Sequence, residues 1–294
     1  MDKEEIESIR KAGEIVKIVK ANAKKWIKSG MLLKEIAEKI ENEIEKSGGR
    51  PAFPVNLGIN EFTAHYTPSY DDETIAEGLL KIDFGVQIDG YTADNAFSID
   101  LENNNENKKL IKASEEALKE AIKSVKNKES LGEIGDKIQK VAEKSGFSPI
   151  RNLSGHGIKQ WDLHSSPTIP NYNNENDTKL KDGVYAIEPF ITNGVGVVYD
   201  GKPSGIYELR KSAAIRDSNA REIFNYIAEN YQTLPFCSRW LVKKFGTRAL
   251  ISLSMIEKTG ALHHFPQLIE KSKSKVAQSE HTIIIQGKDI EVIT

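Results

Sequence analysis

Lys81-Ile-Asp-Phe-Gly-Val-Gln-Ile-Asp-Gly-Tyr-Thr-Ala-Asp94 is the most informative stretch of this sequence. Its first eight residues alternate apolar side chains with polar or small ones, which is the pattern of a strand with one apolar face. Asp89-Gly90 follows, and this dipeptide is the strongest signal for a two-residue hairpin loop. The stretch therefore predicts two antiparallel strands joined by Asp89 and Gly90.

The predicted hairpin brings two aspartates together. With a two-residue loop, Asp83 pairs with Ala96 and Asp94 pairs with Gly85. Asp83 and Asp94 are then diagonal neighbours on one face, about 7–8 Å apart at the backbone. Two carboxylates this close repel each other unless one is protonated or cations lie between them. The alternative is a pair of solvated aspartates on an exposed face, and the hairpin alone leaves both interpretations open.

Three more polar residues stand in unusual surroundings. His156 lies between two glycines, in a predicted loop where the backbone can approach another group closely. Glu188 and Glu280 each lie at the end of an apolar strand pattern, and burial of a carboxylate there is costly unless it is paired or bound to a metal. Each residue alone is explained as well by a strand-end acid or a packed histidine.

The combination changes that balance. Four carboxylates and one imidazole would neutralise two divalent ions, and they match a carboxylate-bridged pair of ions about 3.5–4 Å apart. The candidate ligands are Asp83, Asp94, His156, Glu188 and Glu280.

Helical and strand-like sections alternate along the rest of the chain. Apolar residues spaced by three or four positions predict helices at 4–29, 32–47, 107–126, 131–144 and 218–231. Short apolar stretches broken by glycine and proline predict strands within 51–100, 150–215 and 281–294. Residues 235–278 are expected to form a small helical segment, since no strong strand pattern is present there. Helices that cover strand blocks in two sections give an α+β fold class.

Composition restricts the class of protein. The 41 basic and 43 acidic residues give a formal charge of -2, so neither nucleic acid nor a membrane surface is expected as the main partner. No apolar run approaches the roughly 20 residues that span a bilayer. The acidic start is not expected to be a signal peptide, and the single cysteine, Cys237, cannot form an internal disulfide. These features predict a cytoplasmic protein.

Six short motifs occur in order along the chain: Ala52-Phe-Pro-Val-Asn, Ala64-His-Tyr-Thr-Pro68, Lys81-Ile-Asp-Phe-Gly-Val, Ser154-Gly-His, Ala186-Ile-Glu-Pro-Phe and Ser279-Glu-His-Thr-Ile. Together they resemble the methionine aminopeptidases of the pita-bread fold over nearly the whole chain. By that resemblance Asp83 binds one ion, Asp94 and Glu280 bridge two divalent ions, and His156 with Glu188 hold the second. The resemblance implies Co, Mn, Fe or Zn, and these ligand types do not distinguish among them.

The resemblance also implies an arrangement of domains. The long interval between Glu188 and Glu280 is similar to that of type II members, which carry a small helical insert, and the compact chain is similar to the archaeal form. A winged-helix-like insert is expected at 205–272, and a pita-bread catalytic domain at 1–204 and 273–294.

Further roles follow from the same resemblance. His65 and His164 match two histidines that do not bind metal and that would donate hydrogen bonds to the substrate. Glu188 is the candidate for carrying the proton of the attacking water. Phe53 is expected to line a methionine pocket, with a plain core phenylalanine as the alternative.

A few residues depart from the family pattern or lie outside it. Asn95 stands where threonine is usual, and Phe265 stands where some relatives have a tyrosine near the substrate. His263-His264 looks like a metal-binding dipeptide, but it is expected to be a surface or packing feature without an acidic partner.

The expected activity is removal of the N-terminal methionine from nascent polypeptides whose second residue is small. A monomer is expected, and contact with the ribosome is compatible with that substrate. Two rivals remain: a proline-specific peptidase with the same ligands, and a pita-bread protein that binds RNA or protein without catalysis.

Overall fold

The predicted hairpin is present in the computed structural model, which describes residues 1–294. It consists of β4 (Leu79–Ile88) and β5 (Tyr91–Asp100). The φ angles of the loop residues are 51° at Asp89 and 82° at Gly90, and two positive values are what a type I′ turn requires. The dipeptide signal for the loop is thus confirmed.

The register of the hairpin determines where its two aspartates point. Asp83 lies opposite Ala96 and Asp94 lies opposite Gly85, as predicted. A shift by one residue would turn every side chain to the other face, so this register is what aims both carboxylates at one cavity.

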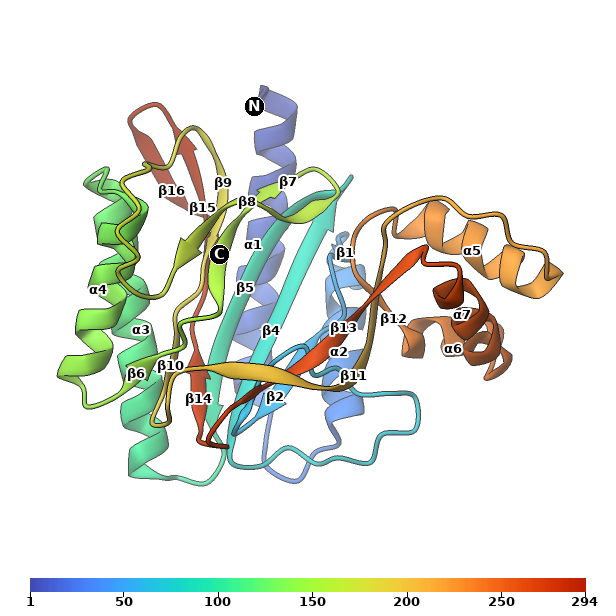
Figure 1. The fold of residues 1–294 in the computed structure, drawn as a ribbon, viewed down its shortest axis with the longest axis horizontal. Helices are drawn as coiled ribbons and strands as arrows, with labels where there is room; N and C mark the ends of the chain where they lie inside the picture. The colour runs from blue at the N-terminus through green and yellow to red at the C-terminus, as the bar shows by residue number, and fades with distance from the viewer.

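Two pairs of helices cover the strands (Figure 1). α1 and α2 enclose an apolar core of 27 buried residues with β4 and β5, and α3 and α4 enclose one of 18 with β9 and β15. No helix combines the length and apolar character that crossing a membrane requires. The helices, which confirm the five predicted ones, are α1 (Lys3–Trp26), α2 (Leu33–Lys46), α3 (Asn105–Lys126), α4 (Leu131–Lys144) and α5 (Ser218–Asn230), followed by α6 (Ser238–Phe245) and α7 (Arg248–Lys258).

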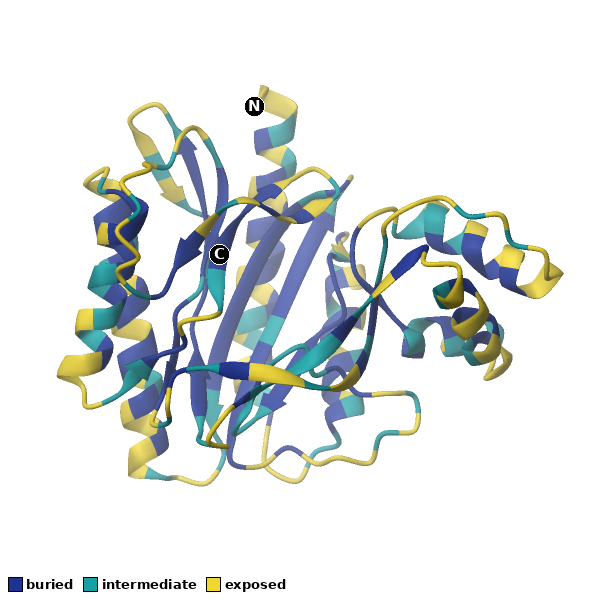
Figure 2. Cartoon of the chain, in the orientation of Figure 1, coloured by how far each residue is buried: buried dark blue, intermediate teal, exposed yellow.

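Four sheets lie between and beside these helices; β4 and β9 are largely buried, whereas β11 is partly exposed (Figure 2). The orders are β1-β4-β2 with β5 beside β4, then β14-β10-β6, β12-β11-β13-β3 and β16-β15-β9-β7-β8. The remaining strands are β1 (Arg50–Pro51), β2 (Asn56–Ile59), β3 (Phe62–Ala64), β6 (Ser148–Pro149), β7 (Ser154–Lys159), β8 (Asp162–Pro170), β9 (Gly183–Ile187), β10 (Phe190–Thr192), β11 (Val198–Leu209), β12 (Phe236–Cys237), β13 (Leu262–Glu270), β14 (Val276–Gln278), β15 (His281–Gln286) and β16 (Asp289–Val292).

The helices α5, α6 and α7 lie to one side of the other elements (Figure 1). They share an apolar cluster of 12 buried residues, which includes Phe236, Leu241 and Leu253. β11 and β13 pair with each other and lead into and out of this helical group. The group falls within 205–272, the range predicted for the insert.

The prediction of a helical segment without strands at 235–278 is wrong in part. α6 and α7 are helical, but β12, β13 and β14 lie in the same range. β13 forms because it pairs with β11 on one side and with β3 on the other. Such pairing between distant segments overrides local propensity, and a local pattern cannot reveal it.

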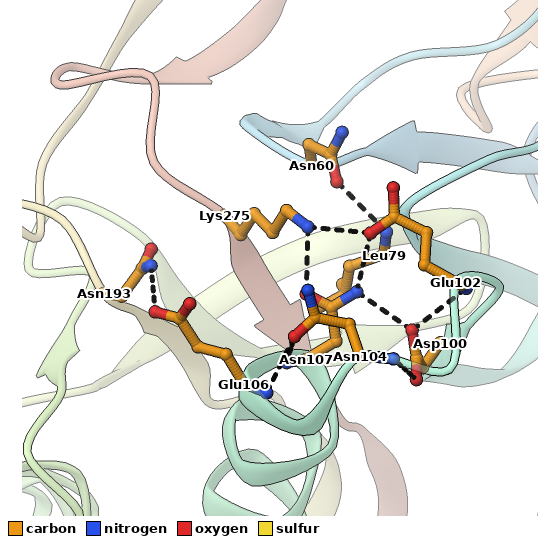
Figure 3. A network of polar contacts seen from close by, with 9 residues as sticks. All are labelled: Asn60, Leu79, Asp100, Glu102, Asn104, Glu106, Asn107, Asn193 and Lys275. Carbon is orange, nitrogen blue, oxygen red and sulfur yellow. Dashed lines mark hydrogen bonds and ion pairs between the residues drawn. The ribbon is translucent and has the colours of Figure 1, made fainter.

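A polar network ties the end of β5 to the start of α3 (Figure 3). Asp100 accepts hydrogen bonds from the Asn104 N–H at 2.7 Å and from the Asn107 amide at 2.9 Å. Lys275 donates to Glu102 and to Asn107, both at 3.0 Å. The network therefore also anchors the chain just before β14.

Candidate metal centre

Asp94 is fixed through its backbone and its carboxylate. Its N–H donates to Thr282 Oγ1 at 2.7 Å, and the Thr282 hydroxyl donates to the Asp94 carbonyl oxygen at 2.8 Å. The Asn95 N–H donates to Asp94 Oδ1 at 2.8 Å. Because Thr282 belongs to β15, these bonds join the hairpin to the five-stranded sheet at the site itself.

His156 lies on β7, so the loop predicted around it is wrong. β7 runs between β8 and β9, and its pairing is irregular beside His156. A Cβ on Gly155 would lie 2.3 Å from the Ala186 carbonyl oxygen, and one on Gly157 would lie 2.6 Å from that of Ser166. The glycines do permit a close backbone approach, but within a sheet.

Glu188 and Glu280 lie at adjacent strand ends. Glu188 follows β9, Glu280 precedes β15, and the two strands pair with His281 opposite Ile187. The Glu280 N–H donates to the Ala96 carbonyl oxygen at 3.0 Å, which holds this end against the hairpin. Two sheets thus deliver the predicted acids to one point.

All five predicted ligands line one cavity of about 270 Å³. Asp94, His156 and Glu280 offer ligand atoms that lie within 4.8 Å of one another. His156 Nε2 lies 3.5 Å from Glu188 Oε1 and 3.8 Å from Asp94 Oδ2. The combination expected from the sequence is therefore a spatial cluster.

Gln278 joins this cluster and was not predicted from the sequence. Its amide donates to Asp83 Oδ2 at 3.2 Å and lies 3.5 Å from Glu188 Oε2. Its separation from Glu280 by two residues is the only signal in the sequence, and a strand there was not expected. Gln278 orients two carboxylates that come from different sheets.

Electrostatics in the cluster favour bound cations. Burial raises the pKa of Asp83 to about 7. Burial, followed by the charge of neighbouring carboxylates, raises the pKa of Asp94, Glu188 and Glu280 well above the usual value. Burial also lowers the pKa of His156 to about 4, so its imidazole is neutral. Four acids that resist ionisation would ionise readily around divalent ions.

The unpartnered atoms fit a metal centre as well. Asp83 Oδ1 and Glu280 Oε1 are buried without a hydrogen-bond partner. His156 Nδ1 lies 3.2 Å from the Gly157 carbonyl oxygen, which can only accept, so Nδ1 carries the proton. His156 Nε2 then turns a lone pair toward carboxylate oxygens, an arrangement that a metal ion between them would stabilise.

The cavity wall beyond the ligands carries the predicted substrate residues. His65, with φ of 57°, places Nδ1 3.3 Å from the Pro266 carbonyl oxygen, and burial lowers its pKa to about 4. The His164 ring lies 4.6 Å from that of His156, edge to face. Three phenylalanines, Phe53, Phe190 and Phe265, belong to the wall. Phe265 thus lines the same cavity as the predicted ligands.

Gly85 makes room for Phe53. A Cβ on Gly85 would lie 2.5 Å from the Phe53 ring and 3.0 Å from the Ala52 Cβ. The absence of a side chain at Gly85 therefore lets the Phe53 ring pack closely against β4.

Two other sequence features lie outside the cavity. Asn95 accepts a hydrogen bond from Lys20 at 2.6 Å, on the helix-covered side of the hairpin. His264 is a packing residue, stacked at 4.0 Å on Tyr207, but the expectation that it lacks an acidic partner is wrong. Its Nδ1 lies 3.0 Å from Glu257, because α7 folds back beside β13.

Known proteins share both the sequence and the fold of this chain. Residues 7–285 match the model of metallopeptidase family M24. The chain is 40% identical to the methionine aminopeptidase of Methanocaldococcus jannaschii over 100% of both chains, and 43% identical to that of Pyrococcus abyssi over 99% of both. The solved structure of a thermophilic Arx1 superposes with a TM-score of 0.83 at 18% identity, covering 100% of this chain and 91% of that one, so it shows likeness of fold.

Proposed function

The chain belongs to metallopeptidase family M24, and we propose that it removes the N-terminal methionine from polypeptides whose second residue is small. The fold is the pita-bread fold, and the activity is that of a metal-dependent aminopeptidase. The observation that carries the proposal is the cluster of four carboxylates, two buried and two half-buried, with one neutral imidazole in a cavity with aromatic walls.

We propose that the cluster holds two divalent ions, Co, Mn, Fe or Zn. Asp83 would bind one, His156 and Glu188 the other, and Asp94 and Glu280 would bridge both. When bound, such ions supply Lewis acidity, which polarises the scissile carbonyl and makes a water molecule acidic enough to attack near neutral pH. The Gln278 amide and the Asn95 N–H keep the carboxylates oriented for this purpose.

The proposed proton carrier is Glu188. Its side chain lines the cavity beside His156, where the attacking water would be held. A carboxylate there can take the proton of the attacking water and return it to the leaving amine. Metal binding through Oε1, on the His156 side, would leave Oε2, which also lies near the Gln278 amide, for this role.

His65 and His164 would contact the substrate in different ways. The Nδ1 proton of neutral His65 is engaged by the Pro266 carbonyl, so Nε2 is available as a hydrogen-bond acceptor. It would therefore accept the substrate amide N–H, whereas the sequence had suggested donation from both histidines. His164, beside His156, is the proposed donor to the oxygen that becomes negative in the transition state.

The cavity also supports a choice of substrate. Phe53, Leu163 and Phe265 give an apolar wall, and a thioether packs well against aromatic rings. The acidic cluster at the base would attract a free α-amine, which restricts cleavage to the first residue. A second residue would lie against the crowded base, so a small side chain is required there.

The proposed working state is a cytoplasmic monomer that acts on nascent chains. The domain division at 205–272 is part of the proposal, supported by the separate apolar cluster of α5, α6 and α7. Within 205–272, Ile206 of β11 and Pro235 before β12 line the cavity wall, so the insert would take part in substrate choice.

The test compares peptides after metal removal and return. Protein stripped by a chelator should be inactive, and Mn²⁺ or Co²⁺ should restore cleavage of Met-Ala-Ser. Leu-Ala-Ser and Met-Asp-Ser should be cleaved at least about 100-fold more slowly, since a misfit at either position costs about 3 kcal/mol of transition-state binding. Faster hydrolysis of a Gly-Pro peptide would favour a proline-specific peptidase. No turnover with either metal, together with tight RNA binding, would favour a binding protein.

A further inference from the structure

A buried ion pair joins the helical insert to the first half of the molecule. Glu41 lies on α2 and Arg239 lies on α6, and they are 7% and 2% exposed. Both guanidinium Nη atoms donate to the carboxylate, one to each oxygen, at 2.8 Å. Such a two-bond arrangement fixes orientation as well as distance, and it requires arginine.

The other hydrogen bonds of the pair go to one loop. Arg239 Nε donates to the Pro68 carbonyl oxygen at 3.1 Å, and Glu41 Oε1 accepts from the Val55 N–H at 3.4 Å. The Thr67 hydroxyl donates to the Val55 carbonyl oxygen at 2.9 Å. The ends of segment 55–68 are therefore tied to each other and to the ion pair.

Segment 55–68 carries one side of the substrate cavity. Asn56, Ala64 and His65 belong to the cavity wall, and His65 has a left-handed backbone conformation with φ of 57°. A residue other than glycine keeps such a conformation only when its surroundings impose it. The pairing of β2 with β4 and of β3 with β13 holds the middle of the segment, and the anchors at Val55 and Pro68 hold its two ends.

The chain just before Arg239 forms another part of the wall. Pro235 lines the cavity, and Leu234 packs with Phe53 in a small apolar cluster. Cys237 pairs with Ile206 of β11, which also lines the cavity. Two parts of the wall thus come from different regions of the chain and meet at Glu41 and Arg239.

We infer that Glu41 and Arg239 are positioning residues that set the spacing between the His65 side and the Pro235 side of the substrate cavity. This inference rests on the proposed function for the identity of the substrate, but not for the geometry. A buried ion pair is a weak source of stability, since apolar residues of similar volume often replace one without loss. Its hydrogen bonds to the loop give this pair a second role.

The experiment measures Arg239→Met beside Arg10→Met, a matched control in which the lost partner is Glu291 of an exposed surface pair. Amide hydrogen exchange in 55–68 should rise by about tenfold or more in Arg239→Met and stay unchanged in the control. KM for Met-Ala-Ser should rise about tenfold because the Pro235 side binds substrate, and kcat should fall about tenfold because the displaced His65 side contacts the substrate amide. Metal content should not change.

A double variant keeps the inference testable if Arg239→Met fails to fold. Glu41→Leu/Arg239→Met buries no unpaired charge and should melt near the wild-type temperature. It still lacks the bonds to Val55 and Pro68, so exchange and KM should remain raised. Wild-type exchange and KM in the folded double variant would overturn the inference. Absence of methionine release by the wild type, with the exchange increase intact, would refute the proposed function alone.

Discussion

Two histidines in the cavity share the same local arrangement but have different proposed roles. His156 and His65 each direct Nδ1 to a backbone carbonyl oxygen, and burial lowers the pKa of each to about 4. Both rings are therefore neutral and keep a lone pair on Nε2. Their neighbours differ: Nε2 of His156 faces carboxylates, which makes it a proposed metal ligand, and His65 lies farther along the wall.

His65→Ala tests this difference directly. The variant should bind metal as the wild type does, because His65 is not among the proposed ligands. Its kcat should fall by about 10²–10³-fold, the magnitude that loss of a preorganised hydrogen bond to the reacting groups usually has. Elemental analysis and steady-state kinetics of the variant test this. Loss of metal in the variant would show that the role given to His65 is wrong.

Asp94→Asn should abolish metal binding and raise the stability of the metal-free protein. A bridging ligand serves both ions, so the variant should retain neither, nor any activity. The metal-free variant should melt several degrees higher than metal-free wild type at pH 7.5, since relief of about 1–2 kcal/mol shifts Tm by about 2–4 °C per kcal/mol.

The pH dependence of that gain follows from the sign of the pKa shift. Burial and then Asp83 raise the pKa of Asp94 in the folded state, so folding binds a proton that the unfolded chain releases above about pH 4. The stability of the metal-free wild type therefore falls as pH rises above that value, whereas the Asp94→Asn variant, which does not ionise there, does not show this decrease. Calorimetry of both proteins from pH 5 to 8 should show a widening difference in Tm; a constant or shrinking difference would contradict it.

At the scale of elements, the hairpin illustrates what the sequence can predict. A two-residue loop allows only one register, so the pairing of Asp83 with Ala96 and of Asp94 with Gly85 follows from Asp89-Gly90 alone. β13 illustrates what it cannot predict, because its partner β11 lies about 60 residues earlier and its pattern is not distinctive. His156 was misplaced for a related reason, since glycines that permit strands to crowd together look like glycines of a loop.

Gly85→Ala tests the packing of the hairpin against the substrate wall. The new Cβ would lie 2.5 Å from the Phe53 ring, so the ring must move. KM for Met-Ala-Ser should rise by about tenfold or more, because lost apolar contact of one or two methylenes costs about 1–3 kcal/mol. Both metal ions should remain. Gly30→Ala, which meets no atom within 4 Å but strains a φ of 85°, controls for loss of stability alone.

At the scale of the whole molecule, the centre is a junction between sheets. The hairpin supplies Asp83 and Asp94, the five-stranded sheet supplies His156, and the adjoining ends of β9 and β15 supply Glu188 and Glu280. The five residues that line the cavity together could be picked out from the sequence because each motif is local. Gln278 could not, and neither could Arg239, because their roles exist only after distant segments meet.

Anomalous diffraction from crystals of the Mn²⁺-loaded protein tests the central claim most directly. We predict two peaks about 3.5–4 Å apart, the spacing of carboxylate-bridged ions. Both should lie within bonding distance of Asp94 and Glu280, with Asp83 beside one peak and His156 with Glu188 beside the other. A single fully occupied peak, or ions bound away from Asp94 and Glu280, would contradict the account.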